Sequence, residues 1–231
     1  MVRCVEPEWL DELPPEDPCA VRSRKDLLRV NAWMGNCGIV TRALRSTCRG
    51  PMPRRLVDLG AGDGKLLLRV ARRLSADWHG TSAVLLDRRN VVSPETHHAF
   101  AALGWHTAAL ETDALGWLKQ PAAPAWDTMI ANLFLHHFPA AQLAALLRAA
   151  ASLARVFVAV EPRRSARSLF CSRLLRLIGC NQVTRHDAPI SIRAGFAGQE
   201  LSQLWPTVGG WSLQERPAGW SSHLFIARRR D

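Results

Sequence analysis

The chain has 231 residues, of which 48% are hydrophobic, and a formal net charge of +10. This length suits one sizeable α/β domain with a small appendage, and the apolar content excludes a disordered chain. Acidic residues occupy the start of the chain, where a secretory signal would be basic and then apolar. No apolar run reaches the length of a membrane span, so we expect a cytoplasmic protein.

The cysteine and histidine spacings indicate no metal site. None of the six cysteines forms a C-x-x-C pair, and no histidine is spaced so as to complete a zinc site. Cytoplasmic thiols are expected to be reduced. The sequence therefore predicts neither disulfide bonds nor a bound metal ion.

Arginines supply almost all of the positive charge, and a basic chain raises the question of a nucleic-acid partner. They are spread from Arg3 to Arg230, and only Arg228–Arg230 form a run of three. The chain has no RNA-recognition signature and no basic arm interleaved with aromatic residues. A scattered basic surface is therefore favoured over nucleic-acid binding.

The N-terminal region is predicted to be an arm followed by a helical cap. Residues 1–20 are rich in proline and acidic residues, which predicts a loose arm. The pattern from Arg24 to Leu44 is helical, and Gly35 and Gly38 indicate two short helices with a break between them. Residues 49–53 read RGPMP and predict a linker. We therefore expect an arm and cap over residues 1–50 and a second domain over residues 51–231.

Strands and helices alternate regularly after this linker, and such alternation calls for a parallel sheet with right-handed crossovers. The predicted strands are Arg55–Leu59, Ala83–Asp87, His106–Glu111, Asp127–Asn132 and Val156–Glu161. The predicted helices between them are Lys65–Leu74, Pro94–Leu103 and Ala140–Ala151. A short helix is expected at Gln199–Leu204, and two strand-like segments, Trp211–Arg216 and His223–Arg229, end the chain. Their short connection requires that these two strands be antiparallel.

The stretch from Arg163 to Gly195 is long for a crossover. It contains a basic amphipathic helix over roughly Ala166–Ile178, and the favoured interpretation is a core helix with a solvated basic face. The alternative is a lid over an apolar substrate. Such a lid would close together with Trp33, Met34 and Arg193.

A glycine-rich loop follows the first predicted strand, in the sequence VDLGAGDGKLLLRVARRL. It is not a Walker A loop, because Leu66 replaces the Ser or Thr and Leu59 stands at the first glycine position. It is not the dinucleotide fingerprint either, because Lys65 stands where the third glycine should be. Asp58 and Asp63 would each repel a pyrophosphate at a cost of order ~1–4 kcal/mol. The loop therefore favours a cationic or neutral ligand.

S-adenosylmethionine meets this requirement, because it carries an ammonium, a sulfonium and a ribose but no phosphate. Asp58 can attract the ammonium, and the N–H groups at the start of the Lys65 helix can meet the carboxylate. Asp87 ends the second strand, about where nucleotide-binding α/β folds place an acid for ribose hydroxyls. The alternative for Asp87 is a surface acid paired with Arg88 or Arg89. Asp113 can accept from an adenine amino group or cap a helix.

The segments DLGAGDG, LLDRR, TDALGW and WDTMIANLFLHHF, in this order and spacing, resemble the class I S-adenosylmethionine-dependent methyltransferases. The resemblance covers about Leu56 to Val160, and the end of the chain in topology. It implies a Rossmann-like sheet of seven strands in the order 3-2-1-4-5-7-6 with the last strand antiparallel. It also implies S-adenosylmethionine as cofactor and S-adenosylhomocysteine as product. The expected cofactor-binding residues are Asp58, Gly60, Ala61, Gly62, Asp87, Arg88, Asp113, Ala114, Asn132 and Leu133.

The exit of the fourth strand, NLFLHHFP from Asn132 to Pro139, indicates the acceptor class. It lacks both prolines of the enzymes that methylate base amines and the Pro-Cys arrangement of those that attack pyrimidine carbon. L-H-H-F resembles the branch that acts on small molecules such as quinone precursors and natural products. We expect O-methylation of a small hydroxylated, aromatic or polyketide-like acceptor. An RNA or protein methyltransferase and a non-catalytic cofactor-binding module are the alternatives, and a homodimer is left open.

A phenol or enol acceptor gains from a base, and histidine is the natural choice near neutral pH. His136 and His137 are the first candidates because both lie at the strand-four exit, although either can instead cap a helix or bond to backbone. His186 is the third candidate because it stands beside Asp187. The alternative is that Asp187 caps a helix or pairs with a neighbouring arginine.

Overall fold

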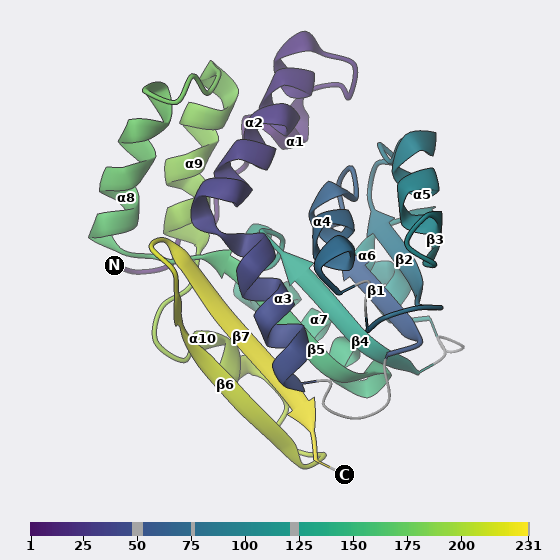
Figure 1. Cartoon of the computed structure of the whole chain (residues 1–231). Coiled ribbons are helices and arrows are strands. Elements are labelled where there is room, and N and C mark those ends of the chain that lie inside the picture. Colours follow the sequence, from purple (N-terminus) through teal and green to yellow (C-terminus); the bar gives the residue numbers. More distant parts are fainter. Residues whose placement is uncertain (48–52, 75–76, 121–124, 231) are drawn as a thin grey trace.

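The computed structural model describes residues 1–47, 53–74, 77–120 and 125–230, which form one sheet with helices on both faces (Figure 1). The strand order is β3-β2-β1-β4-β5-β7-β6. Strands β1 to β5 pair in parallel, and β7 is antiparallel to both β5 and β6. The predicted order and the antiparallel last strand are confirmed. The strands are β1 (Arg55–Leu59), β2 (Ser82–Asp87), β3 (His106–Glu111), β4 (Trp126–Asn132), β5 (Ala154–Pro162), β6 (Trp211–Ala218) and β7 (Ser222–Arg229).

Two apolar layers hold the helices against the sheet. Alternate side chains of a strand point to opposite faces, so in β1 Leu56 joins one core and Val57 and Leu59 join the other. The first core is covered by α3 (Asn36–Thr47), α4 (Lys65–Leu74) and α5 (Pro94–Ala101). The second is covered by α6 (Ala114–Leu118), α7 (Ala140–Leu153) and α10 (Glu200–Leu204). Helix α3, which the sequence assigned to the cap, therefore packs on the sheet.

A separate group of helices stands beyond one end of the sheet (Figure 1). In this group α1, α2 and α8 all pack against α9. Helix α2 ends where Gly35 adopts the left-handed conformation (φ 72°), so the predicted break is confirmed at Gly35. Gly38 lies inside α3. The group consists of α1 (Trp9–Glu12), α2 (Pro18–Met34), α8 (Ala166–Arg173), the 3-10 turn η2 (Leu174–Arg176) and α9 (Gln182–Ala194).

The N-terminal arm is bound to the rest of the protein, and the prediction that residues 1–20 are loose was wrong. The carboxylate of Asp187 accepts the N–H groups of Trp9 and Leu10 at 2.9 and 3.0 Å and so caps α1. The guanidinium of Arg3 donates to the carbonyls of Ala194, His136 and Phe138. These partners lie more than a hundred residues away in the sequence, so local composition could not reveal them.

Three further segments differ from the sequence interpretation. Helix α9 was not predicted, because Pro189 stands inside it and polar residues interrupt its apolar pattern. The amphipathic helix expected over Ala166–Ile178 ends at Arg173 and continues as the turn η2. The RGPMP linker lies outside the described residues except for Pro53. Within the described residues, no helix is both long and apolar enough to cross a membrane.

We expect Asp187→Ala to release the start of α1. Hydrogen bonds to a charged group contribute about 1.5–3 kcal/mol, so the amides of Trp9 and Leu10 should exchange with deuterium at least about tenfold faster. Asp17→Ala is the matched control, since Asp17 caps α2 through the N–H groups of Cys19 and Ala20. Unchanged exchange at Trp9 and Leu10 in Asp187→Ala would show that the arm is held elsewhere.

Candidate active site

A cavity of about 590 Å³ lies between the carboxyl ends of β1, β2 and β4 and the helical group. Ligands bind at this end of open α/β sheets, and the volume lies within the ordinary range for ligand pockets. The structure brings all ten expected cofactor-binding residues to the wall of this cavity, together with His136, His137, Trp33 and Met34. Neither His186 nor Arg193 belongs to that wall.

The glycine loop is shaped by left-handed backbone at Gly60 and Gly62, with φ of 70° and 54°. A Cβ atom on Gly60 would lie 2.2 Å from the ring of Phe134, so only glycine allows this ring to pack on the loop. A Cβ atom on Gly62 would meet no atom within 4 Å, because Gly62 faces the open cavity. The N–H groups of Gly60 and Ala61 both bond to the carbonyl of Leu86, which ties the loop to β2.

Asp58 lies at the carboxyl end of β1 with only 4% of its surface exposed. Among the described residues, no hydrogen bond or ion pair reaches its carboxylate. Burial, and secondarily the charge of Asp87, raise the pKa of Asp58 from 3.8 to about 7. A cation entering the cavity would stabilise the ionised carboxylate, so the site is built for positive charge.

Asp87 and Asp113 are each fixed by backbone N–H groups. Asp87 accepts from Gly62 at 2.9 Å and from Arg89 at 3.1 Å, which aims it along the loop. Asp113 accepts from Gly116 at 2.7 Å and caps α6, so the capping alternative is confirmed. Each carboxylate keeps lone pairs for a ligand.

The side chains of the two arginines after Asp87 contact the N-terminal arm, and neither guanidinium group is paired with Asp87. A guanidinium nitrogen of Arg88 lies 4.0 Å from the carboxylate of Asp11. Arg89 donates to the carbonyls of Asp11 and Leu13 at 2.8 and 2.7 Å. The end of β2 is thereby joined to the helical group across the cavity.

A chain of amides connects β4 to the helices. The Nδ2 atoms of Asn132 and Asn36 both donate to Oδ1 of Asn31, at 3.0 and 2.9 Å. The Oδ1 atom of Asn132 is buried and has no partner within the described part of the chain. An unpaired buried acceptor is costly, so it is suited to a donor group on a ligand. The next residue, Leu133, has the left-handed φ of 51°, which turns the chain out of β4.

Glu161, which sequence reasoning missed, organises the exit of β4. It is fully buried in β5, and its carboxylate accepts the N–H groups of Phe134, Leu135 and His136 at 3.0, 2.9 and 3.4 Å. The same carboxylate bonds to Nδ1 of His136 at 2.8 Å. An acid inside the apolar run VFVAVEP was the available signal. These hydrogen bonds to Glu161 therefore fix the turn that follows β4, η1 (Leu135–His137).

His136 lies between two carboxylates. Its Nε2 atom is 3.4 Å from Oε1 of Glu8, opposite the bond to Glu161. Burial alone would lower the pKa of His136, but the hydrogen bonds to Glu161 and Glu8 raise it to about 9. Burial likewise would raise the pKa of Glu8, but the interactions with His136 and the hydroxyl of Ser191 lower it to about 2. The charged groups at this end of the cavity are therefore paired with one another, whereas the carboxylate of Asp58 at the other end has no partner among the described residues.

His137 is the more accessible of the two adjacent histidines, with 26% of its side chain exposed. Its Nδ1 atom lies 3.4 Å from Oδ2 of Asp11, and its ring centroid is 4.1 Å from that of His136. Burial, and then the neighbouring charge of His136, lower the pKa of His137. His186 instead stacks on Trp9 and bonds to Asp187, away from the cavity wall.

Comparisons with known proteins identify the fold. No family model matches the sequence, and no curated protein matches it. Among solved structures, an O-methyltransferase family protein from Burkholderia thailandensis is 18% identical with a TM-score of 0.64, over 93% of this chain and 61% of that one. Mitomycin 7-O-methyltransferase is 21% identical with a TM-score of 0.62, over 96% and 60%.

A third structure is closer in length to this chain. Magnesium protoporphyrin IX methyltransferase from Synechocystis, solved with bound S-adenosylmethionine, is 16% identical with a TM-score of 0.56, over 96% of this chain and 88% of that one. This chain spans about three fifths of the length of the first two. The strand order and these similarities together show that the protein has the class I methyltransferase fold.

We expect the loss of Glu161 to unfold the exit of β4. Glu161→Ala leaves three backbone N–H groups and a buried imidazole without their acceptor, which should lower the free energy of unfolding by roughly 3–5 kcal/mol. Glu161→Gln keeps an oxygen at the same place and should cost less. Urea denaturation measures both. Glu111→Ala, at the end of β3, is the control, and an equally small effect of both alanine variants would contradict this account.

The buried Asp58 predicts a pH-dependent stability of the ligand-free protein. Because the folded-state pKa is raised to about 7, the protonated carboxyl is favoured by folding. This contribution is present below the unfolded pKa of 3.8 and is lost as pH rises through 7. Asp58→Asn should therefore gain stability relative to the wild type, on the order of 2–4 kcal/mol between about pH 5 and about pH 8. The exposed variant Asp77→Asn should show no such trend in the same denaturation series.

Proposed function

We propose that the protein binds S-adenosylmethionine in this cavity and transfers its methyl group to a small hydroxylated acceptor, releasing S-adenosylhomocysteine. The observation that carries the proposal is the unpartnered carboxylate of Asp58 beside the open face of Gly62. A phosphate ligand would be repelled there, whereas an amino-acid ammonium would be attracted. The Synechocystis methyltransferase of the same fold was solved with this cofactor and with its product bound.

The residues of the cavity fit each part of the cofactor. Asp58 and the orphaned Oδ1 of Asn132 offer acceptors for the ammonium, and the backbone at Gly62 leaves room for close approach. Asp87 ends β2 where ribose hydroxyls would need an acceptor. Asp113 and Ala114 lie at the start of α6, just after β3, the next strand outward from β2, where an adenine ring would extend.

The acceptor would occupy the cavity between the β4 exit and the helical group. The helical wall of the cavity carries large apolar side chains among polar ones, which supports an acceptor with an apolar body. Its apolar side chains are Leu10, Leu27, Leu28, Val30, Trp33, Met34, Leu175 and Ile192. His136 and His137 supply the polar end where a hydroxyl would lie. His186 is a weaker candidate because it does not face the cavity.

The cofactor supplies an activated methyl group and its leaving group, so the protein has to align rather than activate carbon. It must hold the acceptor oxygen about 3 Å from the methyl carbon and in line with the bond to sulfur. The rigid β4 exit and the bound N-terminal arm provide the two walls for this alignment. Oxygen is the favoured acceptor atom because a histidine cluster suits hydroxyl chemistry.

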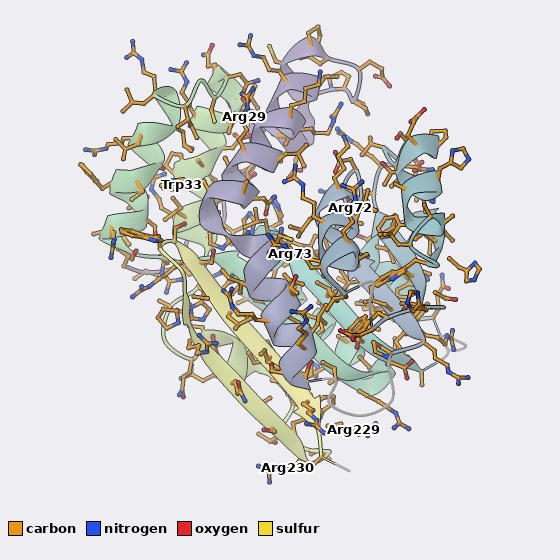
Figure 2. All side chains as sticks on the ribbon, in the orientation of Figure 1. Arg29, Trp33, Arg72, Arg73, Arg229 and Arg230 are labelled. Carbon is orange, nitrogen blue, oxygen red and sulfur yellow. The ribbon has the colours of Figure 1, made fainter. Side chains whose placement is uncertain are left out.

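The charge distribution gives less support to an RNA substrate. Figure 2 labels Arg29 on α2, Arg73 on α4 and Arg229 on β7, in separate parts of the molecule. A nucleic-acid groove would gather its cations along one surface. A module that binds the cofactor without chemistry is the other rival. The proposed methyltransferase would transfer the methyl group of the bound cofactor, whereas such a module would only bind the cofactor.

Titration calorimetry above pH 7 tests cofactor binding. Asp58→Asn and Asp87→Asn should each raise the dissociation constant for S-adenosylmethionine at least about tenfold, because each removes a charged acceptor. Asp77→Asn is the matched control and should bind like the wild type. Failure of the wild type to bind below the millimolar range, or unchanged binding in both cavity variants, would refute the proposal.

Methyl transfer is then measured with labelled cofactor and a panel of phenols, quinones and polyketides, read by mass spectrometry. Label in a panel compound supports the small-molecule assignment. Cofactor binding without any label transfer would favour the binding module. Label in total RNA, abolished by salt, would instead favour the nucleic-acid substrate.

A further inference from the structure

We propose that Glu8, His136 and His137 form a binding site for one divalent transition-metal ion, with zinc the best fit. Each of these residues offers one ligand atom, and the three atoms all lie within 4.8 Å of one another. His136 and His137 come from η1 after β4, whereas Glu8 comes from the residues just before α1. The sequence analysis found no metal site because Glu8 is far from the histidines along the chain.

The spacing of the ligand atoms suits a tetrahedral ion. The Nε2 atom of His136 lies 3.4 Å from Oε1 of Glu8. Two ligands at roughly 2.1 Å from a common tetrahedral ion are separated by about 3.4 Å. The ligand atom of His137 lies within 4.8 Å of the other two, so His137, whose side chain is 26% exposed, would have to move closer to supply the third ligand.

A buried carboxylate orients the first of these ligands. Glu161 accepts from Nδ1 of His136 at 2.8 Å, which directs Nε2 to Glu8, and a metal ion at Nε2 would replace the proton shared with Glu8. Histidine ligands of metal ions commonly donate their other ring N–H to a carboxylate in this way. Glu161 is itself held by the N–H groups of Phe134 and Leu135, which makes the ligand rigid.

The ligand set selects the type of ion. Two imidazole nitrogens and one carboxylate form catalytic zinc sites, and the same set with open positions also binds iron(II). Magnesium and calcium prefer oxygen ligands, so two imidazoles disfavour both. Three protein ligands leave at least one position open, and all three residues face the cavity.

The role of the ion rests on the proposed function, whereas its binding does not. An acceptor hydroxyl at the open position would have its pKa lowered, and its proton would leave to water. The oxygen–methyl bond would form as the carbon–sulfur bond breaks, and the electron pair of that bond would stay on sulfur. His136 and His137 would then act as ligands and not as proton acceptors. The acceptor class would be phenols or enols whose oxygen can reach the ion.

Metal binding is tested on the untagged full chain, treated with a chelator, reloaded with Zn²⁺ or Co²⁺ and desalted. Elemental analysis should find one ion per chain, and Co²⁺ should give a tetrahedral visible spectrum without the charge-transfer band of thiolate ligands. Glu8→Gln and His137→Gln should each weaken Zn²⁺ binding at least about tenfold. Glu6→Gln and His106→Gln are the matched controls, since both residues are exposed and lie outside the cavity.

Glu8→Gln and His137→Gln are both measured, so that one of them still tests the site if the other is misfolded. Glu8 lies in the N-terminal arm but His137 does not, and circular dichroism shows whether each variant is folded. No ion in the wild type, or equal binding by wild type, Glu8→Gln and His137→Gln, overturns the proposal. Calorimetry with S-adenosylmethionine in the presence of chelator separates the two ideas. Cofactor binding without metal binding refutes only the ion site, whereas ion binding without cofactor binding refutes only the methyltransferase.

Discussion

The conformation of the cavity wall after β4 depends on the carboxylate of Glu161. This carboxylate accepts three consecutive backbone N–H groups after β4 and one imidazole N–H, all in the interior. A buried charge is costly unless every lone pair is used, and here the loop uses them. The loop in turn places Phe134 against Gly60, so the glycine loop and the loop after β4 are packed on each other.

Both ends of the cavity contain buried ionisable side chains, but only at one end are these side chains paired with one another. At the β1 end, Asp58 has no partner among the described residues, and its pKa is raised to about 7. At the β4 end, His136 is enclosed by Glu161 and Glu8. The first arrangement leaves room for a cation to arrive with a ligand, and the second already holds positive charge. Under the proposed function, the cationic cofactor would lie beside Asp58 and the acceptor hydroxyl beside His136.

Features set by residues close together in the sequence could be predicted, whereas those that depend on contacts between distant residues could not. Strand β1 and helix α4 were predicted to the residue, because glycines bound both of them locally. The expected cofactor-binding residues lie at or just after the carboxyl ends of neighbouring strands, so the strand order brings them together. Glu161, Glu8 and Asn31 were missed because each contacts a residue at or just after the end of β4 that is far away in the sequence. The sequence around each of them gives no sign of that contact. Helix α9 was missed because Pro189, a residue that usually ends helices, stands inside it and its apolar residues are not regularly spaced.

The bound N-terminal arm changes where the functional unit begins. A boundary drawn before β1 would keep all seven strands and the second apolar layer. It would remove α3 with its part of the first apolar layer, together with Glu8, the amide of Asn31 and the apolar side chains of α2 that line the cavity. A truncated protein that starts at β1 would therefore retain the strand order of the methyltransferase fold but lose the helical wall of the cavity, which under the proposed function contacts the acceptor.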